Sequence, residues 1–186
     1  MKYREFSNLG WKVSEIGIGC WAIGSEWGDV PEQDAKEALY TSIDSGINFF
    51  DTADVYGDGR SEKIIRDVLK NTKEQVYVAT KAGRRLDPHN AEGYNLQNIE
   101  SFIDRSLINL GVDVIDLVQL HCPPSEICGK KETYEMMDEI VKKGKIKYYG
   151  VSVEKVSEAI DAIQYKNVKS IQIIFNIFRQ KPKEIF

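Results

Sequence analysis

The sequence lacks the features of a secreted or membrane-spanning protein. It contains only 3 cysteines in 186 residues, and these follow no disulfide spacing. Residues 1–6 contain no apolar core of a signal peptide, and no later apolar stretch is long enough to span a bilayer. We therefore expect a protein of a reducing compartment, the cytoplasm by default, without membrane contact.

The chain also lacks a large excess of charge of either sign. The 25 Lys and Arg residues against 29 Asp and Glu residues give a net charge of −4, which provides no basic surface for nucleic acid. Hydrophobic residues make up 42% of the chain, as in ordinary globular proteins. We expect a single domain over residues 1–186 with a substantial core, and the composition leaves its oligomeric state open.

The chain alternates between short apolar runs and helical patterns. A hairpin is predicted over residues 2–15, and buried strands are predicted at 16–21, 47–51, 76–81, 115–121, 148–153 and 170–175. Apolar residues at helical spacing separate these strands, at 31–45, 61–69, 95–110, 131–143 and 154–164, with Ser61 expected to cap the second helix. Such alternation predicts a parallel sheet with crossover helices, as an open doubly wound sheet or an eight-stranded barrel.

Three of the predicted strands end at ionisable side chains. These are Asp51, Lys81 and His121, and Tyr56 follows the first of them in the adjoining loop. The carboxyl ends of neighbouring parallel strands meet at one edge of a sheet, so we expect the four side chains to converge there.

Together these four side chains suit the delivery of a proton to a developing alkoxide. Tyrosine has an ordinary pKa near ~10, and a neighbouring ammonium stabilises the phenolate, which makes the phenol a usable acid. A carboxylate is the natural partner of a buried ammonium, and a neutral imidazole can orient a carbonyl oxygen. No side chain supplies the hydride that such a reduction needs, so a nicotinamide cofactor is implied.

The same residues resemble the signatures of the aldo-keto reductases. The segments concerned are 51–57 (DTADVYG) with Ser61-Glu62, Thr80-Lys81, 119–124 (QLHCPP), and 17–21 (GIGCW) after the hairpin. The resemblance implies an α/β protein with a (β/α)8 TIM-type barrel behind an N-terminal hairpin, of which residues 1–186 contain about six of the eight βα units. It also implies reduction of aldehydes or ketones to alcohols with NADPH, with NADH remaining open.

The resemblance further implies a role for each residue of the catalytic set. Tyr56 would be the general acid, Lys81 would tune the pKa of Tyr56, Asp51 would be the partner of Lys81, and His121 would orient the carbonyl group. The partner molecule would be a small carbonyl compound.

For cofactor and substrate binding, the resemblance implies a second group of residues. Ser152 and Gln172 would hydrogen-bond the nicotinamide carboxamide, with Asp51 beside them, and Trp21 would line the substrate pocket. The sequence departs from the family pattern where Val153 follows Ser152, because many members have Asn at that position. The family's stacking aromatic residue and 2′-phosphate loop belong to the seventh and eighth units. We therefore expect the complete protein to carry the activity and residues 1–186 alone to be impaired in it.

A dinucleotide-binding fingerprint supports a competing interpretation. Residues 17–22 spell Gly-x-Gly-x-x-Ala after a predicted strand, and Asp51 ends the next strand, where a ribose-binding acid could lie. However, the next helix starts only near Pro31, and Asp51 lies farther from the motif than the usual ~20 residues. A Rossmann-type dehydrogenase is therefore the second hypothesis, and it leaves Tyr56 and Lys81 without a role.

Two further alternatives are a metal site and a regulatory protein. His121, Cys122 and Cys128 have no fourth ligand at a suitable spacing, so no metal is expected. Relatives of the aldo-keto reductases serve as β subunits of potassium channels, and a non-catalytic, cofactor-binding regulatory subunit is the third hypothesis. Carbonyl-dependent oxidation of NADPH discriminates this hypothesis from an enzyme.

Overall fold

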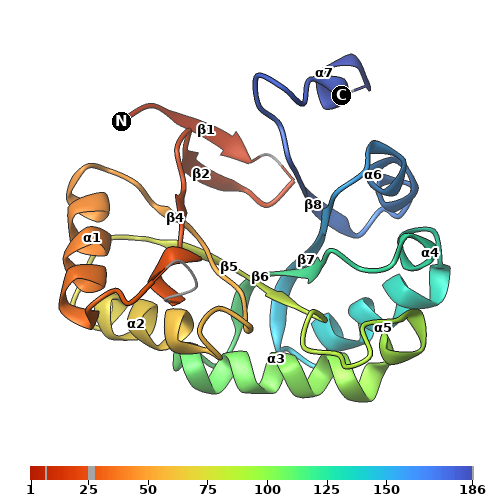
Figure 1. The fold of residues 1–186 in the computed structure, drawn as a ribbon, viewed down its shortest axis with the longest axis horizontal. Helices are drawn as coiled ribbons and strands as arrows, with labels where there is room; N and C mark the ends of the chain where they lie inside the picture. The colour runs from red at the N-terminus through yellow and green to blue at the C-terminus, as the bar shows by residue number, and fades with distance from the viewer. Residues whose placement is uncertain (7, 25–27, 186) are drawn as a thin grey trace.

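The computed structural model describes residues 1–6, 8–24 and 28–185, so Trp27 in the loop before the first helix lies outside the described residues. Six parallel strands form one curved sheet, with helices along its outer side and a two-stranded hairpin on its inner side (Figure 1). The chain is therefore α/β, as predicted. No helix in the described ranges is long and apolar enough to cross a membrane.

The elements follow the predicted alternation. The hairpin is β1 (Tyr3–Phe6) and β2 (Trp11–Ser14), and the parallel strands are β3 (Ile18–Gly19), β4 (Phe49–Asp51), β5 (Tyr77–Ala82), β6 (Ile115–His121), β7 (Ile146–Val153) and β8 (Val168–Ile173). The helices are α1 (Glu32–Asp44), α2 (Arg60–Leu69), α3 (Leu96–Leu110), α4 (Ser125–Cys128), α5 (Lys131–Lys142), α6 (Val156–Ile163) and α7 (Lys181–Ile185), with 3-10 turns η1 (Ala22–Gly24) and η2 (Ala91–Gly93). The short helix α4 was not predicted.

The strands are hydrogen-bonded in chain order, from β3 through β8. A doubly wound dinucleotide-binding sheet reverses its strand order at a switch point, where the cofactor binds. Residues 17–22 lead into the turn η1, and α1 begins only at Glu32. The Rossmann hypothesis is therefore wrong for this chain.

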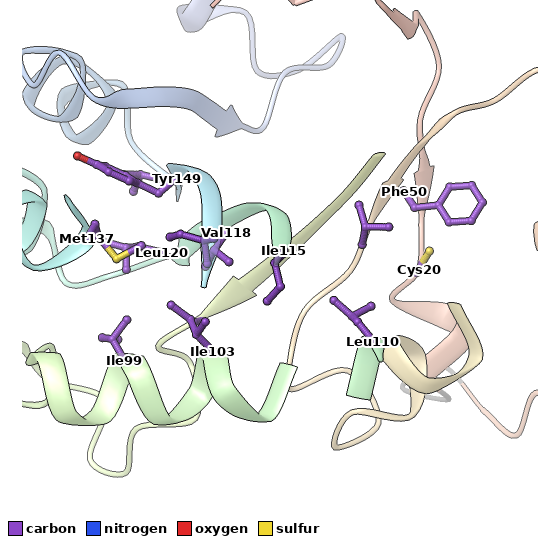
Figure 2. Close-up of a cluster of buried hydrophobic side chains, with 14 of the residues drawn as sticks. Cys20, Phe50, Ile99, Ile103, Leu110, Ile115, Val118, Leu120, Met137 and Tyr149 are labelled. Carbon is purple, nitrogen blue, oxygen red and sulfur yellow. The ribbon is translucent and has the colours of Figure 1, made fainter. Parts of the chain in front are cut away.

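Helix α3 illustrates how local sequence determines an element. The side chain of Asn95 accepts a hydrogen bond from the N–H of Asn98 at 3.1 Å, and Gly111 ends the helix with φ 65°. Between these ends, Ile99 and Ile103 are fully buried, and Figure 2 shows them pointing from the helix toward the side chains of β6. The helix predicted over 95–110 is confirmed to within one residue.

The strand predicted at 16–21 and the helix cap predicted for Ser61 are both wrong. The buried strand expected at 16–21 shrinks to the two residues of β3, and Ile16 is 59% exposed, because β3 is an edge strand that pairs with β4 alone. Ser61 does not cap α2, since the helix begins one residue earlier, after Gly59. The Ser61 hydroxyl lies instead 2.8 Å from that of Thr52 and donates to the Cys20 carbonyl at 3.0 Å.

The inner side of the sheet is filled by the hairpin. Trp11 is 7% exposed and stacks on Tyr77 of β5, with 4.4 Å between ring centroids, while Tyr148 of β7 meets it edge-on at 5.5 Å. Leu9 packs in the same small cluster with Ala79 and Leu117. This cluster occupies the amino-end half of the curved sheet, so the carboxyl ends of the strands are left for polar side chains.

Trp11→Ala should lower the free energy of unfolding by about 3–5 kcal/mol, because it removes the largest apolar group between hairpin and sheet. Urea denaturation measures this change. Lys12→Ala is the matched control, since Lys12 is an exposed neighbour in β2, and it should change the stability by less than about 0.5 kcal/mol. Equal effects of the two substitutions would contradict the burial of Trp11 against the sheet.

Candidate active site

The register of the strands brings the three strand-end residues into a staggered row. Asp51, the last residue of β4, pairs with Ala79 of β5, and Lys81 lies two residues beyond that pair. Lys81 in turn pairs with Gln119, and His121 lies two residues beyond it. Because side chains alternate across a strand, steps of two keep these groups on one face of the sheet.

Lys81 makes the central contacts of this row. Its ammonium donates to Asp51 Oδ1 at 2.7 Å and to the Thr52 carbonyl at 2.8 Å. The Lys81 side chain is 2% exposed, whereas that of Asp51 is 23% exposed. A buried ammonium requires such partners, so the pair fixes the position of the charge at the carboxyl end of β5.

Gln172 joins the same carboxylate from the far side of the sheet. Its amide nitrogen donates to Asp51 Oδ1 at 3.0 Å, although three strands, β5, β6 and β7, lie between β4 and β8 in the hydrogen-bonding order. A flat sheet would keep side chains so far apart in strand order from meeting. The contact therefore crosses the concave side and demonstrates how strongly the sheet curves.

The ring of Tyr56 lies among these groups. The Lys81 ammonium is 5.3 Å from the centroid of the ring, and the His121 ring meets it edge-on with 5.9 Å between centroids. Trp21 lies on another side, at 6.4 Å between ring centroids. The structure thus brings all four residues of the predicted catalytic set together, with Trp21 beside them.

His121 is held as a neutral imidazole. Burial is the largest cause that lowers its pKa, to about 3, and the charges of Lys81, Arg84 and His89 act in the same direction. Its Nδ1 atom is buried without a hydrogen-bond partner among the described residues. A neutral imidazole with an N–H and a lone pair can orient a polar group of a bound molecule.

Comparisons with known proteins agree with this geometry. The chain matches the profile of the Aldo/keto reductase family over residues 15–186. It belongs to the aldo/keto reductase family.

Similar proteins include an oxidoreductase and two aldo-keto reductases. The chain is 34% identical over 187 residues to the uncharacterized oxidoreductase YqkF of Bacillus subtilis, covering 99% of this chain and 59% of the relative. It is 30% identical over 177 residues to the aldo-keto reductase yakc of Schizosaccharomyces pombe, covering 89% of this chain and 50% of the relative. The structure of aldo-keto reductase AKR11C1 from Bacillus halodurans superimposes with a TM-score of 0.84 at 30% identity, covering 99% of this chain and 61% of that one. The chain thus spans between 50% and 61% of the length of these relatives.

Sequence reasoning missed the residues that hold the Tyr56 loop, residues 53–59, of this aldo/keto reductase. Arg105 of α3 donates to the carbonyl oxygens of Asp54 and Asp58 at 3.3 and 2.6 Å, and to the Asp58 carboxylate at 2.8 Å. Arg85 donates to the same carboxylate at 2.7 Å. Nothing in the local pattern marks Arg105, because it lies in an amphipathic helix and its partners are about fifty residues earlier in the chain.

Ser152 and Gln172 lie where a carboxamide could be bound. They pair in register at the carboxyl ends of β7 and β8, and Ser152 also pairs with His121. The hydroxyl of Ser152 can donate and accept, and Gln172 has hydrogen-bonding capacity beyond its bond to Asp51. This donor and acceptor set fits a nicotinamide carboxamide in an aldo/keto reductase.

The three cysteines of this aldo/keto reductase are free thiols. Burial raises the pKa of the thiols of Cys20 and Cys128 to about 12, so both stay protonated. Cys122 adopts φ 46° directly after His121, and its N–H donates to the Ser152 carbonyl at 3.0 Å. In the part of the chain that is described, no three His, Cys, Asp or Glu side chains form a group that could hold a metal.

Proposed function

We propose that the protein reduces aldehydes or ketones to alcohols with a nicotinamide cofactor, and that Tyr56 is the general acid. The observation that supports this most directly is the Lys81 ammonium, which lies 5.3 Å from the Tyr56 ring and is hydrogen-bonded to Asp51. A positive charge beside a phenol favours the loss of its proton. The same charge, buried and paired, is held in place before any substrate binds.

We further propose that the six parallel strands are six units of a (β/α)8 barrel and that residues 1–186 form one domain. The strand order that follows the chain and the Gln172–Asp51 bond across the concave side support this architecture. The edges of β3 and β8 carry unpaired strand groups, which a closed barrel would pair. The greater length of the relatives agrees with two further units.

Each residue of the set has a role in this proposal. His121, as a neutral imidazole, orients the carbonyl oxygen of the substrate and leaves it unprotonated. Tyr56 gives its proton to that oxygen as negative charge develops, and Lys81 stabilises the phenolate left behind. Asp51 holds the Lys81 ammonium in place, and Trp21 lines the pocket for the rest of the substrate.

NADPH is the cofactor that we propose first. Ser152 and Gln172, with Asp51 beside them, would hold its carboxamide, and the bound cofactor would supply the hydride. The name of the Schizosaccharomyces pombe relative carries NADP(+), which supports this choice for a chain 30% identical to it. NADH remains the second candidate, and the test below includes both.

A regulatory subunit is the alternative function. A probable voltage-gated potassium channel subunit beta of Oryza sativa is 30% identical to this chain over 189 residues. The match covers 100% of this chain and 56% of that protein. A protein of that kind would hold the cofactor without rapid turnover. The paired Lys81 and the ring of Tyr56 beside it favour turnover over mere binding, because binding alone does not need an acid.

The deciding experiment measures oxidation of NADPH, and separately of NADH, on addition of a panel of aldehydes and ketones to a chain that carries all eight units. We expect carbonyl-dependent oxidation that is faster with NADPH. Tight NADPH binding with no carbonyl-dependent oxidation would favour the regulatory subunit. Residues 1–186 alone should bind NADPH weakly in a fluorescence titration, because only part of the proposed cofactor site lies in them.

A further inference from the structure

Asp54 is a buried acid for which the proposed mechanism has no use. Its side chain has no solvent exposure, and neither carboxyl oxygen has a hydrogen-bond partner among the described residues. It lies in the loop after β4, between Asp51 and Tyr56 in the chain, and its backbone N–H donates to the Lys81 carbonyl at 3.2 Å. A carboxyl group enclosed beside an active site without partners requires an explanation.

A second buried carboxyl group lies next to it. Glu62 of α2 is also fully buried, but both of its oxygens accept hydrogen bonds, from the Thr80 hydroxyl at 2.7 Å and the Asn109 amide at 2.9 Å. Hydrogen bonds of this kind stabilise a carboxylate, and two neighbouring buried carboxylates repel each other. Of these two carboxyl groups, Glu62 has the hydrogen-bond donors that stabilise a negative charge. Asp54 has none in the described part of the chain, so its protonated form is favoured.

The cations around Asp54 do not reverse this assignment. Arg105 of α3 donates to the backbone carbonyl of Asp54 and to Asp58, and Arg85 donates to Asp58, so neither makes a hydrogen bond to the Asp54 carboxyl group. Burial first and the charge of Glu62 second raise the pKa of Asp54 to about 7, although Arg85, Arg105 and the nearby backbone N–H of Val55 act in the opposite direction. The protonated form is thus the favoured one below about pH 7.

The loop around Asp54 has little room to adjust. Gly57 adopts φ +58°, and a Cβ atom there would lie 2.3 Å from the Gly24 carbonyl oxygen. A Cβ atom on Gly24 would lie 2.7 Å from the carbonyl carbon of Tyr56. A charge on Asp54 could therefore be hydrated only if this segment moved away from the helices beneath it.

We propose that Asp54 is a positioning residue that must hold a proton for the Tyr56 loop, residues 53–59, to stay closed, and that its ionisation in mildly alkaline solution opens this loop. The inference rests on the proposed function only for its consequence in catalysis. The loop closure itself is a property of the folded chain and can be measured without a substrate.

The first test compares the pH dependence of urea denaturation for the wild type and Asp54→Asn. In the unfolded chain Asp54 has an ordinary pKa of ~3.9, so folding takes up a proton in the range between the two pKa values. Stability contributed by the protonated form is lost as the pH rises through that range. From about pH 5 to about pH 8 the equilibrium constant for unfolding should rise on the order of 100-fold more in the wild type than in Asp54→Asn.

Asp58→Asn is the matched control in the same loop. The hydrogen bond from Arg85 and the charge of Arg105 lower the pKa of Asp58, so its carboxylate is ionised across the whole range of the experiment. This substitution should weaken the contacts to the two arginines equally at both ends of the range. Glu62→Gln provides the second variant, because removing the neighbouring charge should lower the pH at which Asp54 titrates.

The second test measures amide hydrogen exchange of residues 53–59 by mass spectrometry. After correction for intrinsic rates, protection in the wild type should decrease as the pH rises from about 5 to about 7 and stay low above it, whereas Asp54→Asn should keep its protection. Equal destabilisation of Asp54→Asn at both pH values, or its failure to fold, would overturn the proposal, because Asn reproduces the neutral shape. A stability shift without a change in exchange would overturn the link to the Tyr56 loop. Neither readout depends on reductase activity, so failure of the proposed function would be seen separately.

Discussion

Tyr56→Phe should lower kcat for carbonyl reduction by at least ~100-fold, the low end for a positioned general acid. The substitution keeps the ring that packs between Trp21 and His121 and removes only the hydroxyl group. The carbonyl oxygen would then have to take its proton from water. Binding of the cofactor should change little, because Ser152 and Gln172, which are proposed to hold its carboxamide, lie on β7 and β8.

Steady-state kinetics and a cofactor titration on the same preparations separate these two effects. Tyr77→Phe is the matched control, because Tyr77 lies at the opposite end of β5 and stacks on Trp11 of the hairpin. The control should keep the kcat of the wild type. A Tyr56→Phe variant as active as the control would show that another group supplies the proton.

The order of the elements could be predicted because it depends on local patterns. Helix α3 has both of its end signals in the sequence, Asn95 and Gly111, and its buried face repeats at helical spacing. The apolar runs that end at Lys81 and His121 likewise predict β5 and β6, because both strands are covered on each side. Local pattern is least informative at the edge of a sheet, and there the strand predicted at 16–21 fails.

The convergence of the strand ends could be expected from the topology, but the contacts between distant residues could not. Gln172 meets Asp51 because the sheet curves by an amount that no local pattern encodes. Arg105 reaches the Tyr56 loop only because α3 packs beside α2. The burial of Asp54 has the same origin, since an acid in a loop is expected to be solvated until the helices beneath it are placed.

Lys81→Met should also lower kcat strongly, and unlike Tyr56→Phe it should lower the stability as well. The substitution leaves Asp51 with the hydrogen bond from Gln172 and without its cation. Because the Asp51 side chain is 23% exposed, water can compensate in part, and we expect a loss of about 1–3 kcal/mol. The kcat should decrease at least ~100-fold, because the phenolate of Tyr56 loses its stabilising charge.

A double substitution separates the two roles of Lys81. Asp51→Asn combined with Lys81→Met removes the uncompensated carboxylate, so the double variant should recover most of the stability in urea denaturation. Its kcat should stay low, since the ammonium beside the phenol is still missing. In Lys81→Met the alkaline limb of the pH–rate profile should also move to higher pH, because a phenol without a neighbouring cation keeps its proton longer. An alkaline limb at the same pH as in the wild type, together with recovered kcat in the double variant, would reduce Lys81 to a structural partner of Asp51.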